Sequence, residues 1–165
     1  MKVTTWSLEM HSPGELQASE KPAALADVTL VESRRPSPSF SRFLYATVGR
    51  DWQWIDRLPW SDEQWLAWLD REGVETWVAY VEGTPAGYFQ LDGATEPGSV
   101  EIAYFGLMPE FIGQGLGGWL LTEAVRRAWA LEPERVWVHT CSLDGPHALA
   151  NYKARGLRVF KEEVS

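Results

Sequence analysis

The chain is poor in cysteine, in long apolar runs and in basic charge, and each shortage excludes a class of protein. Cys141 is the one cysteine among 165 residues, so an internal disulfide cannot form and we expect a cytoplasmic protein. The sequence has no apolar run long enough to span a bilayer, and residues 1–10 lack the pattern of a signal peptide. The formal net charge of −8 argues against a nucleic-acid partner, because phosphate neutralisation needs a basic surface.

The apolar residues make up 45% of the chain, which is enough for the core of one globular domain over residues 1–165. Their spacing predicts helical structure over 40–72, broken near 58–60 and restarted by a capping box of Ser61 and Gln64. The mixture of strands and helices predicts an α/β or α+β sandwich. Strands are expected over 2–9, 28–32, 76–81, 86–91, 100–107 and 136–141, and again from residue 157, with an irregular stretch over 13–26.

The most informative segment is residues 107–119, LMPEFIGQGLGGW, in which four glycines follow an apolar strand and open an amphipathic helix. The first N–H groups of a helix have no partner within the helix, and they carry the positive end of its dipole. Glycine also permits a close approach of a ligand to the backbone. The segment therefore predicts an anion, and a phosphate above all, held by backbone amides.

Two common phosphate-binding motifs fit this segment poorly. A Walker loop ends in Gly-Lys-Ser/Thr, whereas Gly117 and Gly118 are followed by Trp119. Gly113, Gly115 and Gly118 match the dinucleotide spacing, but the acidic residues about 20 positions later precede the next strand and do not end it. A nucleotide-binding protein of another fold is the least favoured reading.

Residues 112–117 resemble motif A of the GNAT superfamily, the acyl-CoA-dependent N-acetyltransferases, whose pattern is Q/R-x-x-G-x-G/A. The leading Gln or Arg of that pattern is Ile112 here. Residues 148–157 are similar to the family's motif B, although Gly145 stands where an asparagine is frequent, so its usual contact is absent or is made by Asp144. The resemblance covers about residues 77–163 and implies a central mixed, mostly antiparallel twisted sheet flanked by helices.

The same resemblance implies acetyl-CoA as co-substrate and assigns roles to particular residues. The CoA pyrophosphate would bind the glycine segment, and backbone N–H groups near Leu107 and Met108 would polarise the thioester carbonyl. Tyr152 aligns with a tyrosine that faces the sulfur and would act as the acid, unless its ring only packs on the sheet. Lys153 and Arg155 could pair with the adenosine phosphate. The cofactor-binding set is Leu107, Met108, Gly113, Gln114, Gly115, Leu116, Gly117, Gly118 and Tyr152.

Amide formation needs a route for the amine proton, and no metal is required for it. Glu101 interrupts an apolar strand, where burial would suit it to accept a proton near neutral pH. His139 on the next strand is the rival, and a water molecule is the third choice. Cys141 has no partner spacing that supports a nucleophile and reads as a structural thiol.

The acceptor is the part that the sequence specifies least. Trp52 and Trp54 are tentative acceptor-binding residues with Glu101 and His139, because aromatic walls beside acidic groups can bind an ammonium group. A primary amine of a small molecule or peptide is expected, and a homodimer is left open. The alternative function is a non-catalytic CoA-binding or regulatory module of the same fold.

Overall fold

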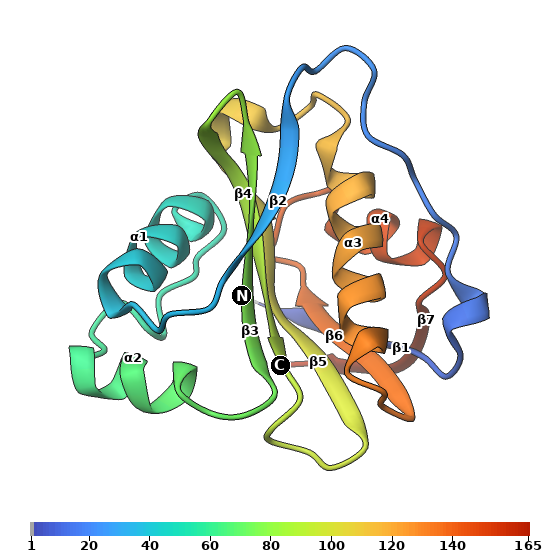
Figure 1. Cartoon of the computed structure of the whole chain (residues 1–165). Coiled ribbons are helices and arrows are strands. Elements are labelled where there is room, and N and C mark those ends of the chain that lie inside the picture. Colours follow the sequence, from blue (N-terminus) through green and yellow to red (C-terminus); the bar gives the residue numbers. More distant parts are fainter. Residues whose placement is uncertain (1) are drawn as a thin grey trace.

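A seven-stranded sheet lies at the centre of the molecule, between two pairs of helices (Figure 1). The computed structural model describes residues 2–165. The strand order is β2-β3-β4-β5-β6-β1-β7, and every neighbouring pair is antiparallel except β5 and β6, which confirms the predicted mixed, mostly antiparallel sheet flanked by helices. The strands are β1 (Thr4–Met10), β2 (Val28–Ser33), β3 (Val74–Val81), β4 (Thr84–Asp92), β5 (Ser99–Leu107), β6 (Arg135–Cys141) and β7 (Arg158–Val164).

Helices α1 and α2 lie on one face of the sheet, and α3 and α4 lie on the other (Figure 1). The apolar stripe of α3 is fully buried in the larger core, because it recurs every three or four residues: Leu120, Leu121, Ala124, Val125 and Ala128. On the opposite face, Leu44 and Val48 of α1 pack on Tyr88 of β4. Within residues 2–165, none of the helices has both the length and the hydropathy that a membrane crossing requires. The helices are α1 (Pro38–Gly49), α2 (Asp62–Leu69), α3 (Leu116–Ala130), α4 (Ala148–Ala154) and the short 3₁₀ turns η1 (Pro13–Glu15) and η2 (Pro109–Phe111).

The segment between α1 and α2, residues 50–61, differs from the prediction of helix up to its break near residue 58. It consists of turns, and only α2 begins where expected, with Ser61 and Gln64 forming the capping box. Helix α1 ends at Gly49, whose carbonyl accepts from the N–H groups of Trp52 and Trp54, and the absence of a side chain at Gly49 makes room for Trp54. Gln53 takes a φ of +65°, which is outside the helical range. The segment therefore folds back towards the sheet.

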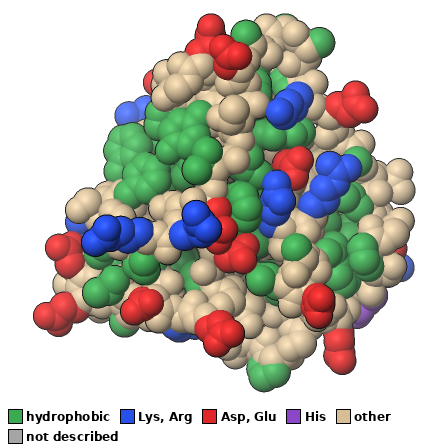
Figure 2. Space-filling model, in the orientation of Figure 1, with side chains coloured by type: hydrophobic (Ala, Val, Ile, Leu, Met, Phe, Trp, Pro, Cys, Tyr) green, Lys and Arg blue, Asp and Glu red, His purple; other side chains and the backbone are tan. Residues whose placement is uncertain are grey.

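Charged side chains of both signs share the face of the molecule drawn in Figure 2. Ion pairs at the surface of the described chain include that of Arg126 with Glu123 and that of Lys161 with Glu163. Such exposed pairs contribute only about 0–1 kcal/mol each. The sheet and the apolar clusters on its two faces, rather than surface ion pairs, therefore stabilise the fold.

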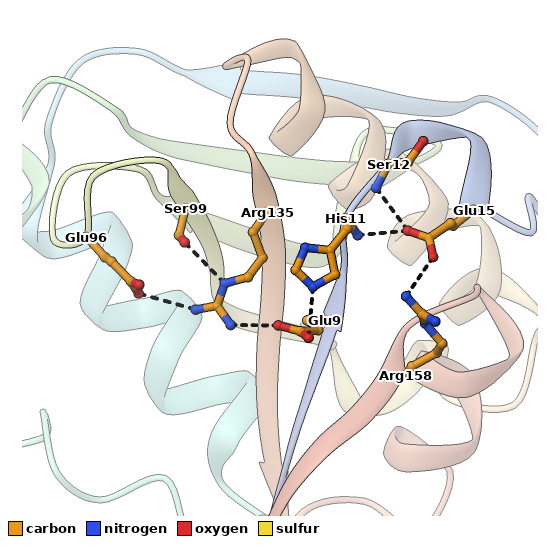
Figure 3. A network of polar contacts seen from close by, with 8 residues as sticks. All are labelled: Glu9, His11, Ser12, Glu15, Glu96, Ser99, Arg135 and Arg158. Carbon is orange, nitrogen blue, oxygen red and sulfur yellow. Dashed lines mark hydrogen bonds and ion pairs between the residues drawn. The ribbon is translucent and has the colours of Figure 1, made fainter.

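Strands β5 and β6 are paired at one end only and diverge beyond it. Their parallel pairing runs from Ser99 opposite Arg135 to Glu101 opposite Trp137 and then stops. The Arg135 guanidinium fastens the paired end, because it donates to Ser99 Oγ at 3.2 Å, to Glu9 at 3.0 Å and to Glu96 at 3.3 Å (Figure 3). The divergence opens a gap in the middle of the sheet.

Candidate active site

A cleft of about 1300 Å³ occupies the gap between β5 and β6. One part of its wall, which we call the glycine side, consists of residues 109–118 together with α4. Another part, which we call the tryptophan side, consists of residues 51–57 with Tyr45, Trp68 and Tyr104. Glu101 and His139 also line the cleft. Residues far apart in the sequence thus share one cavity.

The glycine side presents the free N-terminus of α3. Gly113 and Gly115 both have a φ of +85°, which side chains other than glycine rarely adopt. The helix begins at Leu116, so Gly117 and Gly118 lie in its first turn and not in the loop before it. No side chain in the described part of the chain caps this end, and no acidic residue lies in its first turn. The first N–H groups therefore remain available to an anion.

Helix α4 adds side chains to this anion site. Asn151 Nδ2 donates to the Gly117 carbonyl at 3.1 Å, which joins α4 to the start of α3. A Cβ at Gly118 would lie 2.6 Å from Arg155 Nη1, so the absence of a side chain there makes room for the guanidinium. Arg155 Nε is buried and has no hydrogen-bond partner within residues 2–165. The sequence predicts no role for Asn151, because the contact joins two helices that are distant along the chain.

Of the two expected backbone donors, Leu107 at the end of β5 and Met108 directly after it, only Leu107 faces the gap. The Met108 N–H donates to the Ala86 carbonyl of β4 at 2.8 Å, so the expectation that it polarises a thioester carbonyl is corrected. Alternate residues of an antiparallel strand direct their N–H groups to opposite sides, which turns the Leu107 N–H towards β6. Leu107 is therefore the backbone donor of this wall.

Glu101 and His139 form a pair across the paired end of β5 and β6. His139 Nδ1 lies 3.1 Å from Glu101 Oε2, and the hydrogen bond to this carboxylate raises the pKa of His139 above its usual value. Glu101 is less buried than expected, since 20% of its side-chain surface is exposed. The side chain of His139 is 52% exposed. Two groups that the sequence offered as alternatives are one hydrogen-bonded unit.

A register shift in β5 puts Glu101 on the same face of the sheet as Tyr104. Gln90 pairs with Tyr104 and Leu91 with Ile102, so Ala103 is the extra residue of a bulge. Without the bulge, residues three apart would point to opposite faces. Burial raises the pKa of Tyr104 to about 12, so its hydroxyl stays protonated at neutral pH.

Tyr152 belongs to α4 and lies on the glycine side of the cleft. Its side chain is buried in the larger core, with its ring 6.1 Å from that of Phe105 in an edge arrangement. Burial, and secondarily the Asp144 carboxylate, raise the pKa of Tyr152 well above its usual value. The phenol can therefore donate a proton or a hydrogen bond, but it cannot act as a base near neutral pH.

The loop after β6 is fixed by Asp144. Its Oδ2 accepts from Thr140 Oγ1 at 2.6 Å and from the Cys141 N–H at 3.0 Å, and its Oδ1 accepts from Trp54 Nε1 at 3.3 Å. The carboxylate is thus engaged within the protein, which argues against the expected substitute contact to a cofactor. A Cβ at Gly145 would lie 3.5 Å from the Trp52 ring, so both tryptophans pack on this loop.

The aromatic wall of the tryptophan side is already filled by a cation of the protein itself. The Arg57 Cζ lies 4.2 Å from the centroid of the Trp60 ring, 4.1 Å from that of Trp68 and 4.6 Å from that of Tyr104. These three rings therefore already surround a cation of the protein, whereas acceptor binding by Trp52 and Trp54 stays a prediction. No sequence pattern predicts this role of Arg57, because three separate parts of the chain supply the rings around it.

Solved structures with a similar fold include several acetyltransferases. A GCN5-related N-acetyltransferase from Kribbella flavida has a TM-score of 0.64 at 21% identity, and one from Sphaerobacter thermophilus has 0.66 at 19%, each over 98% of this chain. The chain spans 56% and 50% of the length of those two. An IAA acetyltransferase from Bacillus cereus has a TM-score of 0.58 at 24% identity, over 81% of this chain and 79% of its own. The fold is that of these acetyltransferases.

The family follows from the sequence as well. The model of the acetyltransferase (GNAT) family matches residues 40–157, which is more than half of the chain. The chain therefore belongs to the acetyltransferase (GNAT) family, and the resemblance in residues 112–117 and 148–157 is confirmed. No curated protein matches the sequence.

Proposed function

We propose that this protein transfers an acetyl group from acetyl-CoA to a primary amine of a small molecule or peptide by direct attack. The observation that carries the proposal is the shared cleft, in which a free helix N-terminus and the pair of Glu101 and His139 meet at the gap between two strands. The first suits a pyrophosphate and the second suits an amine that must lose a proton.

The glycine side would hold the cofactor. The N–H groups that open α3 would bind the pyrophosphate, and Arg155 beside Gly118 would meet the further phosphate of the adenosine. The Leu107 N–H would donate to the thioester oxygen as negative charge develops on it. Each of these contacts uses a donor that the folded chain leaves available.

The proton transfers of the reaction define the proposed roles of His139, Glu101 and Tyr152. The amine nitrogen forms a bond to the carbonyl carbon, the bond from that carbon to sulfur breaks, and the amine gives up one proton. Neutral His139, held by Glu101, would take this proton directly or through water. Tyr152 would donate a proton to the departing thiolate, which leaves an amide and the CoA thiol as products.

Calorimetric titration with acetyl-CoA, with ATP and NAD as controls, tests the cofactor. Micromolar binding of acetyl-CoA alone is expected, and binding of ATP or NAD instead would overturn the proposal. Thiol release in the presence of an amine panel then tests turnover, and Tyr152→Phe should lower kcat about tenfold or more while the dissociation constant of acetyl-CoA stays unchanged. Tyr80→Phe on β3, outside the cleft, is the matched control.

A non-catalytic CoA-binding module is the second candidate. Ile112, 45% exposed at the glycine segment, is the observation that favours it, because the motif has Gln or Arg at this position. A module would bind acetyl-CoA and release no thiol with any amine, so the same two measurements separate the candidates.

A further inference from the structure

Arg57 is a half-buried cation for which the described part of the chain provides no counter-ion. Its Nη1 is buried without a hydrogen-bond partner, and none of the carboxylates in residues 2–165 forms an ion pair with its guanidinium. Neighbouring Asp56 is exposed to solvent. Burial lowers the pKa of Arg57, since taking the charge out of water is costly. A partly buried positive charge is stabilised by a negatively charged partner, and the described chain supplies none to Arg57.

Two other partly buried arginines, Arg71 and Arg135, have counter-ions that Arg57 lacks. Arg71 lies 3.5 Å from the Asp92 carboxylate, and Arg135 pairs with both Glu9 and Glu96. Their carboxylates supply the charge that burial demands. Around Arg57, aromatic rings lie where the other two arginines have carboxylates. Each cation–π contact offsets only about 0.5–2 kcal/mol of the cost of burying the charge.

The surroundings of Arg57 hold it in one orientation. Its backbone N–H donates to the Tyr45 hydroxyl at 3.1 Å, which fixes the turn on α1. The rings of Trp60, Trp68 and Tyr104 lie around the planar guanidinium. A side chain packed in this way loses little further freedom when it binds a ligand. Arg57 also lines the cleft, so a ligand in the cleft can reach this region.

We infer that Arg57 is the receptor for a carboxylate group on the acceptor, and that the acceptor is therefore an amine that also carries a carboxylate, such as an amino acid or a derivative of one. The inference rests on the proposed function. A guanidinium fork matches the two oxygens of a carboxylate. Tyr104 links the two ends of the acceptor site, because it touches Arg57 and shares its sheet face with Glu101. The amine would lie at Glu101 and the carboxylate at Arg57.

The test compares amino acids with their own carboxamides, which differ only in the charge of the carboxyl group. Acetyl-CoA-dependent thiol release is measured for each pair with the wild type, Arg57→Met and Arg50→Met. Arg50 is an exposed arginine at the end of α1, so its variant removes a nearby charge without touching the ring cluster. The wild type and Arg50→Met should prefer the acids, and Arg57→Met should lose about tenfold or more in kcat/KM for acids and little for amides.

Several results would overturn the inference. One is that the wild type uses acids and amides equally or prefers the amides. Another is that Arg57→Met lowers kcat/KM for acids and for amides to the same extent. If Arg57→Met does not fold, Arg57→Lys decides, because it keeps the charge but not the fork. Arg57→Lys should retain part of the preference for acids, and full retention would exclude bidentate binding.

A binding measurement separates failure of this inference from failure of the proposed function. If no amine gives thiol release, the proposed turnover is wrong, and the carboxylate site is tested alone by tryptophan fluorescence with benzoate against benzamide. Trp60 and Trp68 border Arg57 and should respond to benzoate in the wild type and Arg50→Met, with at least about tenfold weaker binding in Arg57→Met. An equal response to benzamide, or to benzoate in Arg57→Met, contradicts the inference.

Discussion

The two sides of the cleft differ in the groups that they present, which are backbone N–H groups on one side and side chains on the other. The glycine side uses backbone N–H groups at the start of α3, whose position follows from a regular helix. The tryptophan side uses the side chains of an irregular segment, residues 51–57, packed on Trp68 of α2 and Tyr104 of β5. A cofactor shared by a family can be held by backbone atoms, whereas selection of one acceptor requires side chains. Substitutions should therefore separate the two functions.

The largest expected effect is that of Glu101→Gln. Loss of the carboxylate removes the partner of His139, so kcat should fall about 10²-fold or more for any amine that is turned over. The dissociation constant of acetyl-CoA should not change, because the glycine side is intact. Glu163→Gln on the exposed strand β7 is the control for a lost charge, and a Glu101→Gln variant with wild-type kcat would remove this pair from the mechanism.

Gly115→Val should break the glycine side alone. A β-branched residue at a φ of +85° costs about 1–2 kcal/mol and should shift the first N–H groups of α3, so acetyl-CoA should bind about tenfold more weakly. Gly83→Val has nearly the same φ, +80°, in the hairpin between β3 and β4, with open space around it. Thermal unfolding should show similar destabilisation of both variants. Equal calorimetric affinity of the two for acetyl-CoA would contradict this assignment.

The pH profile sharpens the assignment of the base. Glu101 raises the pKa of His139, so in the wild type the imidazole is already protonated at a pH where an isolated histidine would still be neutral. The rate should fall as the pH decreases through this raised pKa. In Glu101→Gln the acidic limb of log kcat/KM should move to lower pH. In His139→Gln the limb should disappear, and its persistence there would assign it to another group.

The smallest expected effect is that of Asn151→Ala, which tests how α4 supports the glycine side. The variant loses one neutral hydrogen bond to the Gly117 carbonyl, worth about 0.5–1.5 kcal/mol. The affinity for acetyl-CoA should fall only a few-fold, and the preference between acids and amides should be unchanged. Calorimetry and the paired substrates measure the two quantities separately. A change in acceptor preference would show that the two sides are coupled.

Local patterns predicted the elements whose causes are local. The capping box of Ser61 and Gln64, the helix that follows the glycines and the apolar stripe of α3 all depend on residues within a few positions of one another. The prediction was wrong for residues 50–58, because Gly49 and Trp54 turn the chain through a packing contact. It was also wrong for the Met108 N–H, which β4 already uses. Neither contact has a signature in local periodicity.

The class of fold, the family and the start of the helix after the glycines could be predicted from the sequence, because glycine spacing and apolar periodicity act through the backbone over short distances. The pairing of Glu101 with His139, and the place of Arg57 among rings from three elements without a counter-ion, became visible only in the folded molecule. Those relations depend on strand register and on the packing of side chains distant in sequence, and a single sequence read along its length does not contain them.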